Sequence, residues 1–255
     1  MTTAFDVERL RARLPGRRIE YVARTGSTML DAEALLREGC AHGSVAVAGE
    51  QVAGQGRLGR SWHSEPGAGL YASVVLRLPL PAPRLPLVTL ALGLATVDAI
   101  ALAVGLRCDL RWPNDVLARG RKCAGILVQN HGDALIAGIG INANHERFPE
   151  AVGDVAISLR MVTGREQSRE LLLLALLDSI DRRTAQLVSA GTDAILHDFA
   201  KASSFVRGRR VAVEDSGRRL TGVTDGLDPA GFLILRTDAG ARELVLSGGV
   251  RPLEA

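Results

Sequence analysis

The residues with the clearest chemical potential lie in a glycine-rich segment from Gly54 to Trp62. Its sequence, Gly-Gln-Gly-Arg-Leu-Gly-Arg-Ser-Trp, contains three glycines, and Arg57 and Arg60 stand three positions apart. Glycines allow backbone N–H groups to approach an anion closely, and guanidinium groups bind its oxygens. The pattern favours an anion-binding loop, although glycines also suit a solvated connection. It does not fit the dinucleotide fingerprint, because an arginine and a tryptophan follow where a helix should begin.

A tight turn brings a second set of reactive side chains together. The run Arg-Trp-Pro-Asn-Asp at residues 111–115 is followed, after one hairpin, by Lys-Cys-Ala-Gly-Ile-Leu at residues 122–127. A carboxylate, an amide and an amine therefore come close to one another. Pro-Asn-Asp is also ordinary turn chemistry, so that a purely structural role fits the same residues.

A third segment, Gly-Ile-Gly-Ile-Asn-Ala-Asn at residues 138–144, is a predicted strand that runs into two asparagines. Asn142 and Asn144 are two positions apart, which places both amides on one side of an extended chain. The segment fits either a binding site or a pair of buried amides that cap a turn.

Together these segments resemble the biotin protein ligases. Members of that family carry a Gly-Arg-Gly-Arg-x-Gly-Arg-x-Trp loop, a Lys-Trp-Pro-Asn-Asp turn and a Lys-x-x-Gly-Ile-Leu strand in the same order. Further matches are Thr-Gly-Ser-Thr at 25–28, Gly-Ile-Asn at 140–142 and Gly-Gly-Val at 248–250. The resemblance covers nearly the whole chain, and the joint order of the motifs is highly specific.

The resemblance implies a reaction in two steps. The biotin carboxylate first attacks the α-phosphorus of ATP, which gives biotinyl-5′-AMP and pyrophosphate. The ε-amine of a lysine on a biotin carboxyl carrier protein or domain, a subunit of acetyl-CoA carboxylase or a related carboxylase, then attacks the mixed anhydride. Mg²⁺ is expected with ATP, but no carboxylate cluster in the sequence marks its site, and the metal ligands stay unknown.

The resemblance also implies which residues act. The catalytic residues are Lys122, which contacts the biotin carboxylate and the α-phosphate, Arg57, which holds the adenylate, and Asp115. The biotin-binding residues are Ser27, Thr28, Met29, Gln51, Gly54, Gln55, Gly56, Arg57, Lys122 and Gly125. The residues that bind ATP and the adenylate are Arg57, Arg60, Trp62, Asn114, Lys122, Asn142 and Asn144.

We assign Asp115 to the second step as a hypothesis. An amine with a pKa of about 10.4 is mostly protonated at neutral pH, so that a nearby carboxylate would orient it and accept its proton. On this hypothesis, Asp115→Asn slows transfer much more than it slows adenylate formation.

Three positions depart from the family pattern. Gln55 stands where the family often has arginine, which weakens or replaces one cationic contact to the adenylate. Arg111 replaces a lysine, a change that keeps the charge but not its geometry. Met29 stands where a polar residue often follows Ser-Thr, so that its contacts come from the backbone N–H or the thioether.

The elements that must position these residues alternate irregularly between helix and strand. We expect a helix capped by Ser27 or Thr28, another over Leu85–Val104, and helical structure over 168–201. Short strands separated by Asp/Gly turns follow from about residue 206, and their spacing predicts a small β-barrel. We therefore predict an α+β fold: a mixed β-sheet with helices over residues 1–205, then a barrel over 206–255. The resemblance implies a class II synthetase-like biotin/lipoate ligase catalytic domain and an SH3-like barrel.

Composition limits the remaining classes. The 31 basic and 28 acidic side chains leave a net charge of +3, too small to indicate nucleic acid by itself. Three cysteines without paired spacing exclude a disulfide framework and a cysteine-based zinc site, which indicates a reducing, cytoplasmic location. The apolar run at 85–106 carries Asp98 in its middle, and we expect a buried core helix rather than a membrane span.

Two other functions remain open at this point. A lipoate or octanoyl ligase shares the catalytic fold, and a non-catalytic module could sequester biotinyl-AMP, although retention of Arg57 and Lys122 speaks against storage. DNA binding is not expected, because about two dozen residues precede Ser27, too few for a helix-turn-helix unit. Family members form dimers through the sheet of the larger domain, and nothing in the sequence fixes such an interface.

Overall fold

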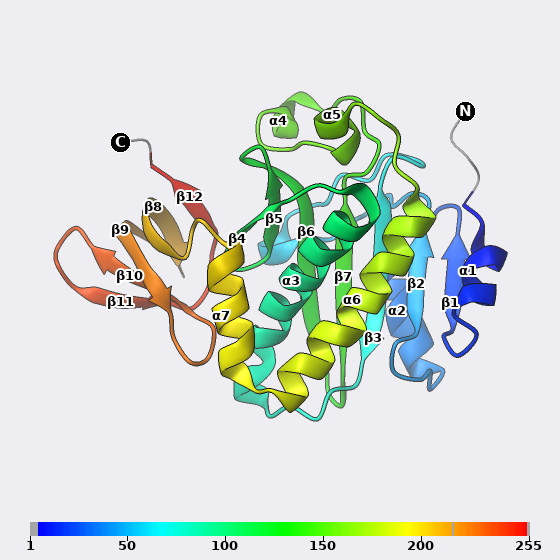
Figure 1. Cartoon of the computed structure of the whole chain (residues 1–255), viewed down its shortest axis with the longest axis horizontal. Helices are drawn as coiled ribbons and strands as arrows, with labels where there is room; N and C mark the ends of the chain where they lie inside the picture. The colour runs from blue at the N-terminus through cyan, green and yellow to red at the C-terminus, as the bar shows by residue number, and fades with distance from the viewer. Residues whose placement is uncertain (1–4, 216, 254–255) are drawn as a thin grey trace.

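The larger part of the chain is built on one mixed sheet (Figure 1). The computed structural model describes residues 5–215 and 217–253. The seven strands lie in the order β1-β2-β3-β7-β6-β5-β4; β1 and β2 are parallel and every other neighbouring pair is antiparallel. The strands are β1 (Ile19–Val22), β2 (Val45–Ala48), β3 (Leu70–Leu76), β4 (Asp109–Arg111), β5 (Asp115–Ala118), β6 (Arg121–His131) and β7 (Ala134–Ile141).

Helices cover both faces of this sheet. The helices are α1 (Val7–Arg13), α2 (Thr28–Arg37), α3 (Leu85–Val104), α4 (Glu150–Gly153), α5 (Leu159–Thr163), α6 (Arg169–Ser189) and α7 (Thr192–Ala202), with short 3₁₀ turns at Arg57–Gly59 and Ala82–Arg84. Figure 1 shows α3 and α6 side by side over one face and α2 behind the other. Alternate residues of β3 divide between these layers: Val74 and Leu76 belong to the α3/α6 core, and Val75 belongs to the cluster under α2.

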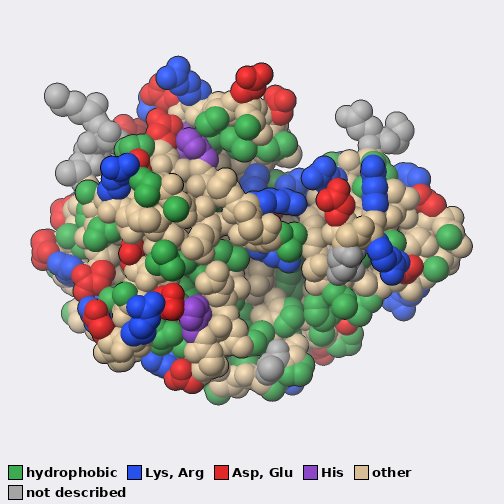
Figure 2. Space-filling view, turned by 180° about the vertical axis from the view of Figure 1, so that it is seen from behind, with side chains coloured by type: hydrophobic (Ala, Val, Ile, Leu, Met, Phe, Trp, Pro, Cys, Tyr) green, Lys and Arg blue, Asp and Glu red, His purple; other side chains and the backbone are tan. Residues whose placement is uncertain are grey.

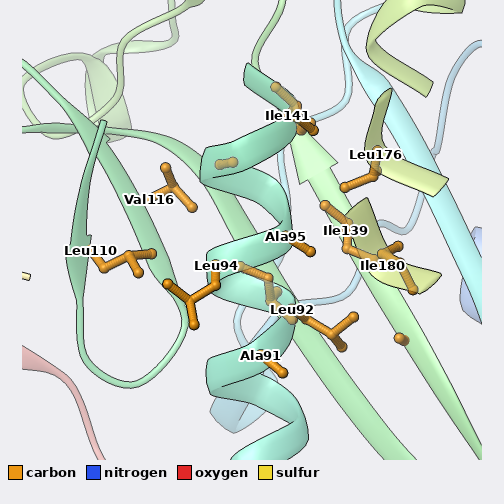
Figure 3. Packing of buried hydrophobic residues seen from close by; sticks show 14 of the residues in the cluster. Ala91, Leu92, Leu94, Ala95, Leu110, Val116, Ile139, Ile141, Leu176 and Ile180 are labelled. Carbon is orange, nitrogen blue, oxygen red and sulfur yellow. The ribbon is translucent and has the colours of Figure 1, made fainter. Parts of the chain in front are cut away.

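The predicted helix over Leu85–Val104 is confirmed as the centre of the core. Pro86 stands in its first turn, and Gly105 ends it in the left-handed conformation at φ 76°. By length and composition α3 could cross a membrane, but 67% of its most apolar window is buried inside the protein. Figure 3 shows its side chains packed against strand residues such as Ile139 and against Leu176 of α6. The charged Asp98 is accommodated because it pairs with Arg183 of α6.

A second, five-stranded antiparallel sheet forms the C-terminal part. Its strands are β8 (Arg207–Asp215), β9 (Arg218–Leu227), β10 (Leu233–Thr237), β11 (Arg242–Val245) and β12 (Val250–Pro252), in the order β11-β10-β9-β8-β12. The indole N–H of Trp112 donates to the carbonyl of Gly231 at 2.9 Å, which ties this sheet to the β4–β5 turn. The predicted α+β class is confirmed. The division at residues 205/206 falls between α7 and β8, and we retain it as a proposal.

Other elements differ from the prediction. The helical region that we expected over 168–201 is two helices, because Gly191 lies between them at φ 80°. The strand β1 and the helices α1, α4 and α5 had no counterpart in the prediction. All four are short, and periodicity is weakest over so few residues.

Candidate active site

The glycine-rich segment folds back on itself between β2 and β3. Gly56 N–H donates to the carbonyl of Arg60 at 2.7 Å, and Trp62 N–H donates to that of Gly54 at 2.8 Å. A Cβ on Gly54 would lie 2.6 Å from the Trp62 carbonyl oxygen, so that only glycine fits this closure. Leu58, at the tip, has φ 56° and ψ 38° and is exposed. The fold-back turns Trp62 towards the sheet.

The segment closes over a cavity on the α2 face of the sheet. The residues that line it include most of the predicted biotin-binding set: Ser27, Thr28, Met29, Gln51, Gln55, Gly56, Arg57, Trp62, Asn114, Lys122, Gly125, Ile126, Leu127, Gly138, Ile139 and Gly140. The structure therefore brings Arg57 and Lys122, which are 65 positions apart in the sequence, into one cavity. Gly54 does not line the cavity. Its role is to permit the fold-back of the segment, which leaves no room for a side chain at this position.

Glycines on two adjacent strands form the floor of this cavity. Gly138 and Gly140 face α2 because they follow Ile136 at every second position of β7. Gly140 lies opposite Gly125 of β6 in the strand register. An added Cβ would lie 2.5 Å from the Trp62 ring at Gly140 and 2.6 Å from the Met29 sulfur at Gly138. The missing side chains thus make room for Trp62 and Met29 to pack directly against the backbone of the sheet.

One end of the cavity is a neutral hydrogen-bonding network at the start of α2. The Gln51 side-chain oxygen accepts from the backbone N–H of Thr28 at 2.8 Å and from its hydroxyl at 3.1 Å. The Thr28 hydroxyl also lies 2.8 Å from that of Ser73, and the Gln51 amide N–H donates to Ser64. Ser27 caps the helix by accepting from Met29 N–H, as predicted. Neutral donors and acceptors of this kind suit a polar but uncharged ligand group.

Paired charges surround Lys122, which lines the other end of the cavity. The Lys122 ammonium lies 2.5 Å from one oxygen of Asp115, and the Arg111 guanidinium donates to the other oxygen at 2.7 and 3.2 Å. Burial alone would raise the pKa of Asp115, but the charges of Lys122 and Arg111 outweigh it and hold that pKa below its usual value. Asp115 is therefore an ionised counter-ion. The Lys122 ammonium also lies 5.3 Å from the centre of the Trp62 ring.

Arg57 holds a positive charge that its neighbours only partly offset. Its guanidinium donates to the side-chain oxygen of Asn114 at 3.2 Å and to the carbonyl of Gly248, in the C-terminal part, at 3.4 Å. Burial lowers the pKa of Arg57, with Asp115 opposing and Arg60 reinforcing that effect. Asn114 is held in turn by its amide N–H, which donates to Ile126 O. A half-buried guanidinium with neutral partners favours an incoming anion.

A wider groove of about 670 Å³ opens beside the cavity. Its lining residues are Arg60, Ser61, Trp62, His63, Arg111, Asp115, Gly120, Lys122, Asn142, Phe148, Val152, Asp154, Val155, Ala156, Arg251 and Pro252. Figure 2 shows Lys and Arg side chains gathered where the two parts of the chain meet. Lys122 and Trp62 line both the cavity and the groove. Lys122 therefore stands at the junction of two binding spaces.

Asn142 and Asn144 lie in different surroundings. Asn142 lines the groove, and its amide N–H groups donate to the carbonyls of Lys122 and Ile157, both at 3.3 Å. The amide of Asn144 is satisfied at both ends by the backbone of Gln167, at 2.7 and 2.9 Å, and Asn144 lines neither space. The structure therefore does not bring Asn144 together with Asn142 at the groove, and its adenylate contact stays a prediction. Asn114, predicted to bind ATP and the adenylate, lines the cavity together with Arg57 and Lys122.

Sequence reasoning missed two contributors to the groove. The segment from Phe148 to Ala156 lies beside β6 because Lys122 N–H donates to the Val155 carbonyl at 2.7 Å. Arg251 enters from β12 of the C-terminal part. No motif marks the segment from Phe148 to Ala156, whereas Arg251 directly follows the Gly-Gly-Val motif at 248–250, which was the available signal.

Two families of known proteins match this chain. The biotin/lipoate A/B protein ligase family matches residues 21–145, and the biotin protein ligase C-terminal domain matches residues 207–250. Among curated relatives, a biotin--[acetyl-CoA-carboxylase] ligase of Mycobacterium tuberculosis is 35% identical over 239 residues, covering 91% of this chain and 88% of that protein. A protein of the same name from Paracoccus denitrificans is 34% identical, covering 86% and 94%.

Longer relatives and solved structures agree with these matches. A bifunctional ligase/repressor BirA of Bacillus spizizenii is 30% identical over 92% of this chain and 74% of that protein. The solved structure of the biotin protein ligase from Aquifex aeolicus, in complex with biotin and ATP, superposes with a TM-score of 0.81 at 29% identity. The superposition covers 93% of this chain and 99% of that one.

Proposed function

The chain belongs to the biotin protein ligase family, and on that premise we propose that it biotinylates a carrier protein in two ATP-dependent steps. The first step forms biotinyl-5′-AMP and releases pyrophosphate. The second transfers the biotinyl group to one lysine of a biotin carboxyl carrier protein or domain. The resemblance stated from the motifs is thereby confirmed at the level of the family.

The observation that supports this reaction best is the place of Lys122. Biotin is assigned to the cavity and ATP to the groove, so that the carboxylate and the α-phosphorus meet where the two spaces join. Lys122 lines both spaces. The carboxylate needs no general base, since a carboxyl with a pKa of about 4.3 is already ionised at neutral pH. The main obstacle is repulsion between two anions, which a positioned ammonium reduces.

Arginines of the glycine-rich segment supply further positive charge. We assign Arg57 to the adenylate phosphate on the cavity side, because its half-buried guanidinium has only neutral hydrogen-bond acceptors in the described chain. Arg60 is assigned to the polyphosphate on the groove side. The Trp62 ring, which lines both spaces, would then pack against both biotin and the nucleotide. This closure would also protect the water-labile anhydride.

The neutral end of the cavity is assigned to the ureido group of biotin. Thr28 and Gln51 offer a hydroxyl, an amide oxygen and an amide N–H within one small network. Met29, over Gly138, provides an apolar wall for the thiophane ring. This division, polar at one end and charged at the other, matches the two ends of the biotin molecule.

The geometry changes our hypothesis for Asp115. Both of its carboxylate oxygens already contact cations, and its pKa is held below the usual value, which makes it a weak proton acceptor. We now propose Asp115 as a positioning residue for the Lys122 ammonium, needed in both steps. Orientation of the acceptor amine remains compatible with this place, whereas proton removal by Asp115 is not favoured.

Several further assignments rest on the family or the chemistry. Mg²⁺ would enter with ATP, and Asp115 and Asp154 are the carboxylates among the described residues of the groove. The acceptor is proposed to be a carboxylase subunit, as the names of two relatives indicate. We also retain as proposals a cytoplasmic location, the absence of DNA binding, and a homodimer formed through the large sheet.

The test is a reconstituted reaction with the purified protein. Biotin, ATP, Mg²⁺ and a biotin carboxyl carrier domain are expected to give biotin-dependent pyrophosphate release and a carrier heavier by one biotinyl group. Lipoate supplied in place of biotin is expected to give neither product. Preferential use of lipoate would reassign the substrate to the rival ligase class. Binding of biotinyl-AMP without pyrophosphate release would instead indicate a non-catalytic module.

A further inference from the structure

Three side chains that can bind a metal converge beside the groove, outside the residues assigned above. His63 and Glu65 lie in the segment that leads from Trp62 into β3, and His145 follows β7. One ligand atom from each side chain lies within 4.8 Å of the other two. The rings of His63 and His145 are 5.8 Å apart. This His63–Glu65–His145 cluster is brought together from two segments about 80 positions apart.

The hydrogen bonds of His145 leave one of its nitrogens without a partner. The Tyr71 hydroxyl donates its single hydrogen to the carbonyl of Glu65 at 3.1 Å, and its oxygen lies 3.4 Å from Nε2 of His145. With that hydrogen assigned to Glu65, Nε2–H of His145 is the donor in the second contact. The lone pair of the neutral ring then lies on Nδ1, which is buried and has no partner among the described residues. His145 itself is fully buried. Such unsatisfied atoms are rare in native proteins.

Ring packing accounts for only part of this arrangement. His145 stacks on Phe148 with ring centres 4.8 Å apart, and His63 meets the same ring edge-on at 6.2 Å. These contacts explain why the imidazoles lie in an aromatic environment. They do not supply a hydrogen-bond partner for the buried Nδ1, and they do not account for the Glu65 carboxylate in the cluster. An imidazole whose second nitrogen donates to a fixed oxygen is the usual state of a metal-binding histidine.

The donor set identifies the class of cation. Two imidazole nitrogens and one carboxylate form a His₂Glu set, which suits Zn²⁺ with a fourth position left for water. Mg²⁺ and Ca²⁺ prefer oxygen ligands throughout. Bonds of about 2.0–2.2 Å require the three ligand atoms to approach to roughly 3.5 Å of one another. His63 and Glu65 are exposed, so that rotation of these two side chains closes the site around a stationary His145.

We propose that His63, Glu65 and His145 form a binding site for Zn²⁺ or a similar imidazole-preferring divalent cation, next to the nucleotide groove. The site adjoins the groove because His63 lines it and directly follows Trp62. A bound cation would tie the segment that carries Trp62 to the chain after β7. The inference stands on this cluster alone and holds whether or not the proposed reaction is correct.

Metal binding to the intact protein tests the proposal directly. Protein freed of metal by a chelator is titrated with Zn²⁺ in a calorimeter, and Co²⁺ is added separately to record its visible spectrum. We expect about one equivalent of Zn²⁺ to bind, with a tetrahedral Co²⁺ spectrum, and affinity to fall at least about tenfold in His63→Ala and in Glu65→Gln. Both side chains are exposed, so that these variants should fold, as circular dichroism would verify.

The matched control is His197→Ala, which removes an exposed histidine from α7. It should bind Zn²⁺ like the wild type, and a millimolar excess of Mg²⁺ should not displace the zinc. Zinc affinity unchanged in His63→Ala and Glu65→Gln would overturn the proposal, because the metal would then be held elsewhere, for example by cysteines. Equal loss in His197→Ala, or displacement by Mg²⁺, would also overturn it.

Discussion

The ammonium of Lys122 and the carboxylate of Asp115 form an ion pair at 2.5 Å across the adjacent strands β5 and β6. The strand register brings the two side chains near each other. Asp115 lies opposite Gly125 and Lys122 lies opposite Leu117, and the register of the two strands shifts between these pairs. Gly125 carries no side chain, and an added Cβ there would lie 2.8 Å from the Lys122 side chain. The glycine therefore allows the lysine to lie along the sheet and reach the carboxylate.

This pairing predicts that Asp115→Asn impairs adenylate formation itself. Without the carboxylate, the ammonium loses the counter-ion that fixes its place, and we expect biotin-dependent pyrophosphate release to fall roughly 10- to 100-fold. When biotinyl-5′-AMP is supplied directly, the rate of transfer to the carrier should fall by no more than the same factor. Normal pyrophosphate release with slow transfer would restore our original hypothesis, in which Asp115 serves only the attacking amine.

Lys122→Ala should abolish the first step while leaving the fold intact. The side chain is partly exposed and lies at a cavity wall, so that truncation removes charge without opening the core. A loss of at least about 10²-fold in pyrophosphate release is expected from removal of one group that stabilises developing charge. The chain contains just one other lysine, Lys201, exposed on α7, and Lys201→Ala is the matched control. A near-normal rate in Lys122→Ala would contradict the central role given to it.

Much of the fold and site could be predicted because the signals are local. The helix over Leu85–Val104 has its proline, its glycine and an apolar run in register, and the structure contains it with those bounds. The motifs that contain Thr28, Arg57 and Lys122 follow one another in an order that indicates a known family. Gly125 and Gly140, which make room for the Trp62 ring, belong to these motifs. Their structural role becomes clear only in the folded sheet, where β6 and β7 lie side by side.

Where the geometry differs from the expectation, the cause is equally specific. We placed Asn142 and Asn144 on one side of the chain by assuming that the strand continues, but β7 ends at Ile141. Beyond that residue the period of two no longer applies, and Asn144 turns to Gln167. His145 lies in the same turn, and its contact with the segment after Trp62 has no periodic signal. Long-range packing of this kind cannot be read from spacing.

Two neighbouring arginines of α6 allow a test of buried against exposed ion pairs. Arg183 pairs with Asp98 of α3 and Asp198 of α7, and its side chain is 18% exposed, whereas the pair of Arg182 with Asp178 is more than half exposed. We expect Asp98→Ala to lower the free energy of unfolding by about 1–3 kcal/mol, since it removes a partner of a half-buried cation. Asp178→Ala should change it by less than about 0.5 kcal/mol. Urea denaturation of both variants measures the difference, and equal effects would contradict the interpretation.

The assignment of biotin to the neutral end of the cavity predicts the effect of Thr28→Val. Valine keeps the shape of the side chain but removes the hydroxyl that contacts Gln51 and Ser73. The KM for biotin should rise roughly tenfold or more, because a polar ligand group and a buried amide both lose a partner, while the KM for ATP should stay nearly constant. Thr184→Val, which removes a buried hydroxyl in α6 far from the cavity, is the control. A larger rise in the KM for ATP than in that for biotin would place biotin elsewhere.

Gly140→Ala tests whether the glycine floor determines the position of Trp62. The new methyl group would lie 2.5 Å from the indole ring, so that the ring must move away from β7 and from Lys122. We expect a higher KM for ATP and a destabilisation of about 1–3 kcal/mol, the usual cost of overpacking. Gly16→Ala, where an added Cβ meets nothing within 4 Å, should be neutral.

A double variant separates this clash from a general effect on the strand. Trp62→Phe in the Gly140→Ala background shrinks the ring that meets the methyl group, so that the two substitutions should be less destabilising together than the sum of their separate effects. The KM for ATP should stay high in the double variant, because the indole that lines the groove is gone. Strictly additive changes in unfolding free energy would mean that Gly140 is needed for the β7 backbone rather than for the ring above it.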